Sequence, residues 1–264
     1  MKTLVMANQK GGVGKSALLC QYAYYLALEL NLRVLVLDLD HQGNTSKAIK
    51  LSNHALVSSV SASRILGERI ASIDTASFVL VAADDALLKA EKQAALHNTY
   101  ATNLQAFLRS VDAEFDVCLI DTNPNPDIRM TAALVVSQYV LSPIQLNQEA
   151  LDGIGALNAD VRKIKAALNP QLQLIGILPN LVEATPFQRA NLAQLVQHFA
   201  KLLIPMDAPG QYAFVKTRTA VAEAQAAGLP VWKLGKTSAM DCWRELRPVF
   251  HRIAGVMGVA GNGA

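Results

Sequence analysis

The chain has 264 residues, a length at which an α/β fold commonly forms one domain. Hydrophobic residues make up 52% of it and charged residues 17%, which excludes a disordered tail. No apolar stretch reaches membrane-spanning length and no basic-then-apolar leader precedes Thr3, so we expect a cytoplasmic protein with no membrane partner.

The cysteine and histidine content gives no sign of a metal or redox centre. The three cysteines, Cys20, Cys118 and Cys242, stand far apart, and the five histidines form no paired ligand set. We therefore expect ordinary buried thiols.

The first patterned stretch is typical of a phosphate-binding loop. Thr3–Met6 reads as a strand and Ala17–Leu30 as a helix, with a glycine-rich loop between them. Backbone N–H groups in such a loop, together with the helix N-terminus, hold a polyphosphate. Lys15 would pair with the β- and γ-phosphates, and Ser16 would bind Mg²⁺. The residues predicted to bind the nucleotide here are Gly11, Gly12, Val13, Gly14, Lys15, Ser16 and Ala17.

This loop departs from the ordinary P-loop pattern, because Gln9 stands where a glycine is required. The sequence fits a variant, Lys-Gly-Gly-x-Gly-Lys-Ser, with an extra lysine at Lys10. An ordinary glycine turn is the alternative, but it needs no flanking lysines. At these residues the sequence resembles the ParA/MinD group of deviant-Walker ATPases. The resemblance implies ATP and Mg²⁺ as cofactors, and a Lys10 that reaches across a dimer to the partner's nucleotide.

A second strand, Arg33–Asp38, is an apolar run that ends in an acid, as in a buried parallel strand that delivers a carboxylate to a site. An ordinary turn is one interpretation of the polar loop that follows, since Asp, Asn and Gly favour turns. The resemblance instead implies a switch loop, in which Asp40 positions the attacking water and Asp38 lies near Mg²⁺. His41 stands where the family usually has proline, so we expect a more mobile loop with altered water geometry.

The next part of the chain alternates between weak and strong patterns. Leu51–Asp74 is weakly patterned, Phe78–Ala82 reads as a strand and Ala86–Arg109 as a long helix. Glu114–Asp121 then repeats the apolar run that ends in aspartate. Downstream of a P-loop, this position predicts that Asp121 is a Walker B carboxylate, which holds a Mg²⁺-bound water.

Beyond Asp121, the segment Thr122–Pro126 departs from the adjacent prolines that the family more often has. Two further strands, Tyr139–Pro143 and Leu172–Leu178, flank a helix at Leu151–Leu168. This alternation predicts the α/β class, a mostly parallel twisted sheet with helices on both faces. Loops at the carboxyl ends of the strands would converge on one ligand site.

Three features follow the last predicted strand. Asn180 occupies a place where relatives contact adenine, although a turn or capping asparagine is equally compatible. Pro186–Leu203 reads as a helix, and Pro205–Thr217 as a turn-rich connector. Arg218–Val231 resembles the family's late motif of an arginine, a short Glu-Ala helix and Gly-x-Pro.

The C-terminal segment, residues 211–264, is basic. It holds seven Lys and Arg against three Asp and Glu, a net charge of +4, whereas the first 210 residues sum to −1. The final predicted helix, Ser238–Met257, contains Pro248, at which we expect a kink. Its apolar stripe, expected to dock on the body, comprises Trp243, Leu246, Phe250, Ile253 and Met257. The adjacent basic stripe of this helix comprises Arg244, Arg247 and His251. We interpret it as part of a DNA-binding surface, and an ordinary solvated face is the alternative. The predicted DNA-binding residues are Arg218, Lys233, Lys236, Arg244 and Arg247.

Together these features predict a single P-loop ATPase domain over residues 1–264, with no room before Thr3 for an N-terminal helix-turn-helix. The resemblance implies a weak, partner- and DNA-stimulated ATP hydrolase that forms a homodimer with ATP and binds nonspecific DNA on the nucleoid. With a ParB-like adaptor it would partition or position a plasmid, a chromosome or another cargo. One alternative is a MinD-like membrane-associated ATPase, although the Gly-rich C-terminus lacks an amphipathic membrane helix. Another is a biosynthetic P-loop ligase that resembles dethiobiotin synthetase.

Overall fold

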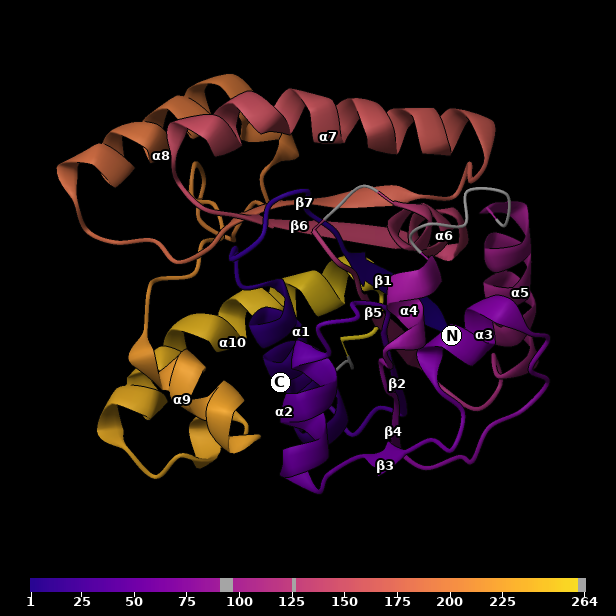
Figure 1. Ribbon diagram of the computed structural model, residues 1–264. Helices are drawn as coiled ribbons and strands as arrows, with labels where there is room; N and C mark the ends of the chain where they lie inside the picture. The colour runs from indigo at the N-terminus through magenta and orange to yellow at the C-terminus, as the bar shows by residue number, and fades with distance from the viewer. Residues whose placement is uncertain (91–96, 125–126, 261–264) are drawn as a thin grey trace.

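A parallel sheet forms the centre of the molecule (Figure 1). The computed structural model describes residues 1–90, 97–124 and 127–260. In these residues, seven strands pair in the order β3-β4-β2-β5-β1-β6-β7, each parallel to its neighbour. The strands are β1 (Lys2–Met6), β2 (Val34–Asp38), β3 (Leu56–Val57), β4 (Phe78–Val81), β5 (Val117–Asp121), β6 (Tyr139–Ile144) and β7 (Gln173–Pro179).

Helices connect successive strands, as parallel pairing requires. The α-helices are α1 (Lys15–Tyr24), α2 (Asn44–Ser52), α3 (Ala62–Gly67), α4 (Ala86–Ala90), α5 (His97–Ser110), α6 (Ile128–Val136), α7 (Gln148–Ala167), α8 (Pro186–Phe199), α9 (Thr219–Ala227) and α10 (Thr237–Met257). A π-helical turn, Tyr25–Glu29, extends α1, and 3₁₀ turns cover Ala200–Leu202 and Val231–Lys233. None of the helices in the described ranges is long and apolar enough to cross a membrane.

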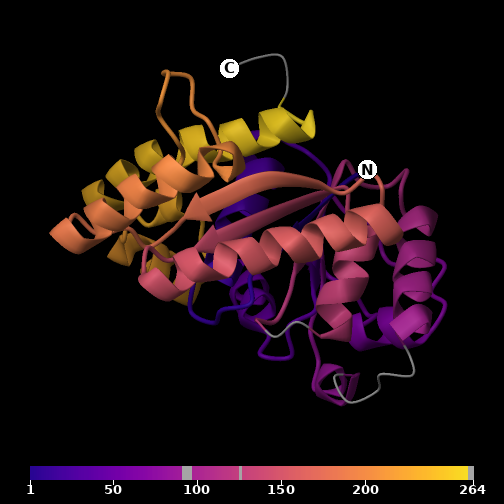
Figure 2. The same cartoon turned by 90° about the horizontal axis from the view of Figure 1, so that it is seen from above.

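Side chains that alternate along the strands divide the core between the two faces of the sheet. Leu4 and Met6 of β1 pack in one cluster with α1, α2, α9 and α10. Val5, between them in sequence, packs in a second cluster with α3, α5 and α6. Figure 2 shows α10 and α7 on opposite sides of the β6–β7 part of the sheet. β2 and β5 are buried along their whole length, including the aspartates at their carboxyl ends.

The late segment α9 is held against α2 by a close backbone approach. Gly228 caps α9 with φ of 65°, in the left-handed region that favours glycine. A Cβ at this position would lie 2.5 Å from Cβ of Leu51 and 2.7 Å from the carbonyl oxygen of Ala48. Because only glycine allows this contact, the family-like Gly-x-Pro motif brings α9 beside the loop that follows β2.

The predicted fold class is confirmed, and so are the six predicted strands and the buried thiols. The apolar stripe of α10 also packs in the core as expected. The weakly patterned stretch after Leu51 contains β3 and α3, which the sequence did not reveal because β3 has two exposed residues and α3 only six. The long helix predicted from Ala86 is described as α4 and α5, and residues 91–96 between them lie outside the described residues.

Candidate functional site

A cavity of about 630 Å³ lies at the carboxyl ends of β1, β2 and β5. The glycine-rich loop forms one wall, the loop after β2 another, and α2 and α9 close the sides. Its lining residues are Gly11, Gly12, Val13, Gly14, Lys15, Ser16, Ala17, Asp40, Gln42, Asn44, Lys47, Ala48, Leu51, Pro124, Gln225 and Ala226. The structure therefore brings the predicted phosphate loop and the predicted switch loop to the same cavity.

The shape of the glycine-rich loop depends on two left-handed glycines. Gly12 has φ of 75°, and Gly14, with φ of 81°, caps the N-terminus of α1. The Asn180 amide donates to the Val13 carbonyl oxygen at 2.7 Å, and a Cβ on Gly14 would lie 2.4 Å from that amide nitrogen. Asn180 thus supports the loop and is not one of the described residues that line the cavity. Its predicted adenine contact remains a prediction.

Lys15 is the first residue of α1, and its side chain lies along the loop. Its ammonium donates to the carbonyl oxygens of Asn8 and Lys10, each at 3.4 Å. Burial lowers the Lys15 pKa, while the charges of Asp121 and Asp40 oppose that shift. A cation at a helix N-terminus, on the wall of an open cavity, is suited to a polyphosphate.

Lys10 belongs to a different hollow from Lys15. It lines a smaller cavity of about 220 Å³, which Asn8, Ile144 and Glu149 also line. The Lys10 ammonium forms an ion pair with the Glu149 carboxylate, and its backbone N–H donates to Oδ1 of Asn8 at 2.9 Å. The predicted second lysine of the motif is therefore held outside the main cavity in this chain.

Asp38 and Asp121 face the site from neighbouring strands, and both are completely buried. Asp38 Oδ2 accepts from the Ser46 backbone N–H at 2.8 Å and from its hydroxyl at 2.6 Å, and Oδ1 accepts from the Asp40 N–H at 3.2 Å. Burial and the charge of Asp121 raise the Asp38 pKa to about 7. Asp38 thus ties the start of α2 to β2, and its predicted place near Mg²⁺ remains a prediction.

Asp121 keeps one oxygen free of the protein. Oδ2 accepts from the Thr45 hydroxyl at 2.7 Å, whereas Oδ1 is buried with no hydrogen-bond partner in the described ranges. Burial raises the Asp121 pKa. Mg²⁺ is commonly held by one or two carboxylates, waters and substrate phosphates. A buried carboxylate oxygen without a partner, behind a loop that offers the Ser16 hydroxyl, fits such an ion.

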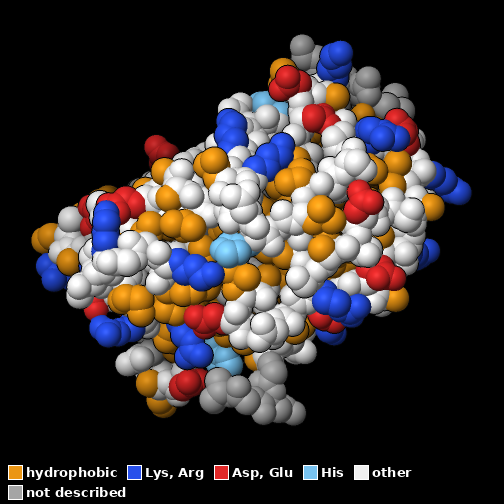
Figure 3. Space-filling model, turned by 90° about the horizontal axis from the view of Figure 1, so that it is seen from below, with side chains coloured by type: hydrophobic (Ala, Val, Ile, Leu, Met, Phe, Trp, Pro, Cys, Tyr) orange, Lys and Arg blue, Asp and Glu red, His pale blue; other side chains and the backbone are white. Residues whose placement is uncertain are grey.

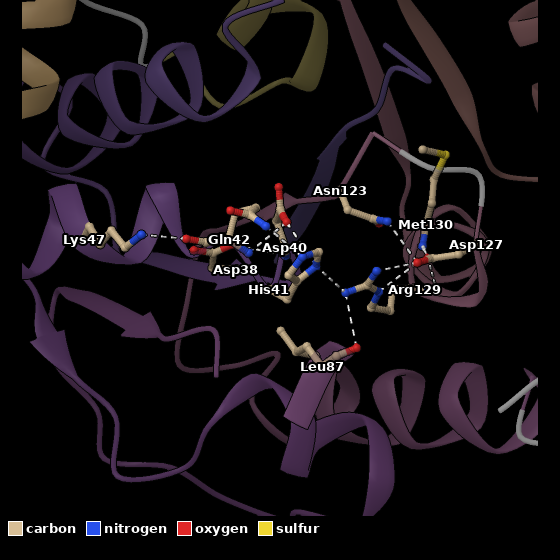
Figure 4. A network of polar contacts seen from close by, with 10 residues as sticks. All are labelled: Asp38, Asp40, His41, Gln42, Lys47, Leu87, Asn123, Asp127, Arg129 and Met130. Carbon is tan, nitrogen blue, oxygen red and sulfur yellow. Dashed lines mark hydrogen bonds and ion pairs between the residues drawn. The ribbon is translucent and has the colours of Figure 1, made fainter. Parts of the chain in front are cut away.

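The switch-loop aspartate, Asp40, is nearly buried and lines the main cavity. Its Oδ1 accepts from the Gln42 backbone N–H at 3.0 Å and lies 3.7 Å from Nδ1 of His41. His41, which stands in place of the expected proline, is held by polar contacts (Figure 4). Its Nδ1 lies 3.4 Å from the guanidinium of Arg129, and its Nε2 lies 2.8 Å from the Gln42 amide. The predicted mobility of this loop took no account of these polar partners of His41.

Sequence reasoning missed several residues of this site. Thr45 and Ser46 were predicted as the end of the polar loop but lie in the first turn of α2, and their hydroxyls donate to the two buried aspartates. Gln225 and Ala226 reach the cavity from α9, far along the chain. Of these, Gln225 could have been found, because it lies in the recognised late motif. Arg129 could not have been found, because the sequence pattern does not distinguish a buried, paired arginine from an exposed one. Residues 125 and 126, in the segment Thr122–Pro126 that departs from the family pattern, lie outside the described residues.

The predicted DNA-binding side chains are exposed on α10 and the segments before it, but most are ion-paired. The pairs are Lys216 and Arg218 with Glu245, Lys236 with Glu223, Arg244 with Asp241, and Arg247 with Glu29, at 2.6–3.1 Å. Figure 3 shows Lys and Arg side chains mixed with Asp and Glu across one face of the molecule, without a continuous basic area. The net charge of the segment therefore overstates the local positive potential, and the DNA surface remains a prediction.

Comparisons with known proteins show the family and the fold. A family model described as an AAA domain matches residues 1–174. Protein IncC of Escherichia coli is 35% identical over 272 residues, which cover 98% of this chain and 71% of IncC. The chromosome-partitioning ATPase Soj of Thermus thermophilus is 32% identical over 202 residues, with 76% and 78% coverage. A structure of Cyanothece McdA with ATP superposes with a TM-score of 0.79 at 19% identity, over 100% and 99% of the two chains.

Proposed function

Because the chain belongs to the ParA-type partition ATPases, we propose that it hydrolyses ATP slowly in the main cavity and uses the nucleotide cycle to partition or position DNA. The observation that carries this proposal is that Lys15 and Asp40 line one cavity at the carboxyl ends of the strands, while the buried Asp121 ends β5 close enough for its charge to act on Lys15. Phosphate binding, water activation and metal binding each need one of these groups, and their closeness supports one site for all three.

The residues divide the chemistry as follows. The loop N–H groups and Lys15 would hold the β- and γ-phosphates, and Asp40 would orient the attacking water. Ser16 and Asp121 would hold Mg²⁺, which neutralises phosphate charge when it is bound. Asn180 would fix the loop through its bond to the Val13 carbonyl. These roles use the side chains as they lie, apart from a local adjustment of the Lys15 ammonium toward the phosphates.

Lys10 would complete the site of a second copy. It lies outside the cavity of its own subunit, on an ion pair whose carboxylate is 82% exposed. An exposed pair of this kind contributes little to stability, so a nucleotide phosphate on a facing subunit can replace Glu149 as the partner of Lys10. ATP would then close a homodimer, in which Lys10 stabilises charge that develops on the partner's phosphates.

Dimerisation would also create the DNA-binding form. Each surface phosphate contact adds a modest, salt-sensitive contribution, so one subunit would hold DNA weakly. Two subunits double the contacts of Lys233, Lys236, Arg244 and Arg247 with a duplex, with Arg218 as a further candidate. These residues would bind phosphates without reading bases, and a ParB-like adaptor would stimulate hydrolysis and release the DNA.

The test is phosphate release from purified protein with ATP and Mg²⁺ and no other small molecule. Slow release that is faster with nonspecific duplex is expected, while Lys15→Ala should abolish both release and ATP binding in a calorimetric titration. Release that requires a small-molecule acceptor would indicate a ligase instead. ATP-dependent pelleting with liposomes, without binding to duplex, would favour a MinD-like activity. Unchanged ATP affinity in Lys15→Ala would contradict the assigned cavity.

A further inference from the structure

We infer that Arg129 is a positioning residue, which locks the switch loop carrying Asp40 to the segment that follows the Walker B strand. Its guanidinium lies between His41 of the first segment and Asp127 of the second (Figure 4). This inference rests on the proposed function, because it assigns Asp40 a role in hydrolysis.

The burial of Arg129 is the first observation. Its side chain is fully buried, although arginine is rarely buried unless its charge is paired. Removing a guanidinium from water costs several kcal/mol, which must be offset by good geometry and further hydrogen bonds. An arginine that sat in α6 for packing alone would gain nothing that an apolar side chain could not supply.

The anchor of this arginine is Asp127, the N-cap of α6. The Asp127 carboxylate accepts from the backbone N–H groups of Arg129 and Met130, at 2.8 and 3.3 Å. It also accepts from Nε and a terminal nitrogen of Arg129, at 2.9 and 2.5 Å, and from the Asn123 amide at 2.9 Å. Such a forked contact fixes the plane of the guanidinium. The Asp127 carboxylate thereby ties Asn123, just after β5, and the Arg129 guanidinium to the start of α6 as one hydrogen-bonded unit.

From this unit, the other terminal nitrogen of Arg129 reaches two separate segments. It donates to the Leu87 carbonyl oxygen of α4 at 3.2 Å and lies 3.4 Å from Nδ1 of His41. A guanidinium only donates, so Nδ1 must accept and the proton of a neutral imidazole lies on Nε2. Nε2 lies 2.8 Å from the side-chain amide of Gln42, and a proton on Nε2 requires this amide to turn its oxygen toward the ring, because an amide NH2 group only donates. The ring is therefore oriented on both sides.

His41 passes this orientation to the cavity. Its neighbours in sequence, Asp40 and Gln42, both line the cavity, and the Gln42 backbone N–H donates to Asp40. A shift of His41 would rotate the peptide units on both sides of it, and with them the carboxylate proposed to orient water. His41 and Asn123 are also the two places at which the switch segments depart from the expected prolines. The structure joins these departures through Arg129 and Asp127, so a hydrogen-bonded bridge replaces the stiffness that proline supplies.

The test compares Arg129→Met with Asn169→Ala as a matched control. Asn169 caps the other end of the same helix, because its amide donates to the carbonyl oxygens of Leu134 and Ser137 at 3.0 and 2.6 Å. Both variants destabilise the α6 region, but only Arg129→Met cuts the bridge. We expect Arg129→Met to lower kcat roughly 10- to 100-fold with ATP affinity changed less than about threefold. It should also speed amide hydrogen exchange in residues 40–43. Asn169→Ala should leave kcat and this exchange unchanged.

The His41 side of the bridge gives an independent test that keeps Arg129 in place. His41→Asn offers an amide oxygen near the position of Nδ1 and should retain most of kcat, whereas His41→Ala should behave as Arg129→Met does. The double variant His41→Ala/Arg129→Met should be no slower than the slower single variant, since both remove one bridge. Equal losses for Asn169→Ala and Arg129→Met, or additive effects in the double variant, would overturn the inference.

Failure of the proposed function would look different. A wild-type protein that releases no phosphate would refute the hydrolysis. Hydrogen exchange of nucleotide-free protein would still decide whether the bridge exists. Should Arg129→Met fail to fold, His41→Ala and His41→Asn carry the comparison, because the His41 side chain is 23% exposed and its loss leaves no empty core.

Discussion

Asp38 and Asp121 occupy paired positions at the carboxyl ends of adjacent strands, β2 and β5, and neither is exposed to solvent. Two buried carboxylates of like charge raise each other's pKa and destabilise the fold when both are ionised. The fold retains this arrangement although it is unfavourable. A bound cation would relieve it, which is the physical link between the stability of the fold and the proposed nucleotide cycle.

Replacing one carboxylate by its amide should therefore stabilise the apo protein. In Asp121→Asn, the amide oxygen can still accept from Thr45, while the charge beside Asp38 is gone. We expect the free energy of unfolding to rise by about 1 kcal/mol, and Mg²⁺-dependent ATP hydrolysis to be lost. Urea unfolding in EDTA measures the first effect and phosphate release the second. A less stable variant would contradict the like-charge account.

The same pair predicts the pH dependence of stability. The Asp38 pKa is about 7 in the folded chain against an ordinary value of 3.8, so the folded state binds more protons between these pH values. Stability must then fall as pH rises from about 5 to 7, by at most about 1.4 kcal/mol per pH unit for one proton. The hydrogen bonds and ion pair with Arg33 lower the pKa of Asp116, so Asp116 changes the stability only at pH values below this range. Urea midpoints in EDTA at pH 5 and 7 check the slope, which should be smaller in Asp121→Asn.

The ion pair between Lys10 and Glu149 predicts two unequal variants. Lys10→Ala should keep monomer ATP binding but lose ATP-dependent dimerisation, because the partner's phosphates lose their cation. Glu149→Gln frees Lys10 at the cost of one exposed pair, so it should strengthen dimerisation by no more than about fivefold. Light scattering across an ATP titration distinguishes them. A Lys10→Ala protein that still dimerises with ATP would refute the role across the interface.

The basic stripe of α10 can be tested by charge reversal. Arg244→Glu with Arg247→Glu removes two proposed phosphate contacts and adds repulsion, so binding of nonspecific duplex should be lost while ATP-dependent dimerisation remains. Lys2→Glu, at the opposite edge of the sheet from the cavity, serves as a charge control. Binding equal to wild type in the same buffer would mean that this stripe is a solvated face and that the DNA surface lies elsewhere.

The sequence allowed the fold and the phosphate loop to be predicted because their signals are local. Apolar runs that end in Asp38 and Asp121 mark the central strands, and the loop around Gly14 has a spacing that few other structures need. The sides of the cavity, which α2 and α9 form, could not be predicted in this way. Gln225 meets Asn44 through a contact 181 residues apart in sequence, and α9 approaches α2 only because of the glycine at 228. Arg129 was hidden for a related reason, since its burial depends on three segments that meet only in the fold.

The most direct test of the proposed ATPase cycle is a paired measurement on Asp40→Ala. Asp40 lines the cavity from the switch loop, and within the described ranges none of its hydrogen bonds goes to the glycine-rich loop, so its loss should spare the phosphate cradle. The variant should bind ATP with near wild-type affinity, release no phosphate above background, and accumulate as an ATP-bound dimer in light scattering. Wild-type turnover in Asp40→Ala would contradict the account, because the cavity would then lack the carboxylate assigned to activate water.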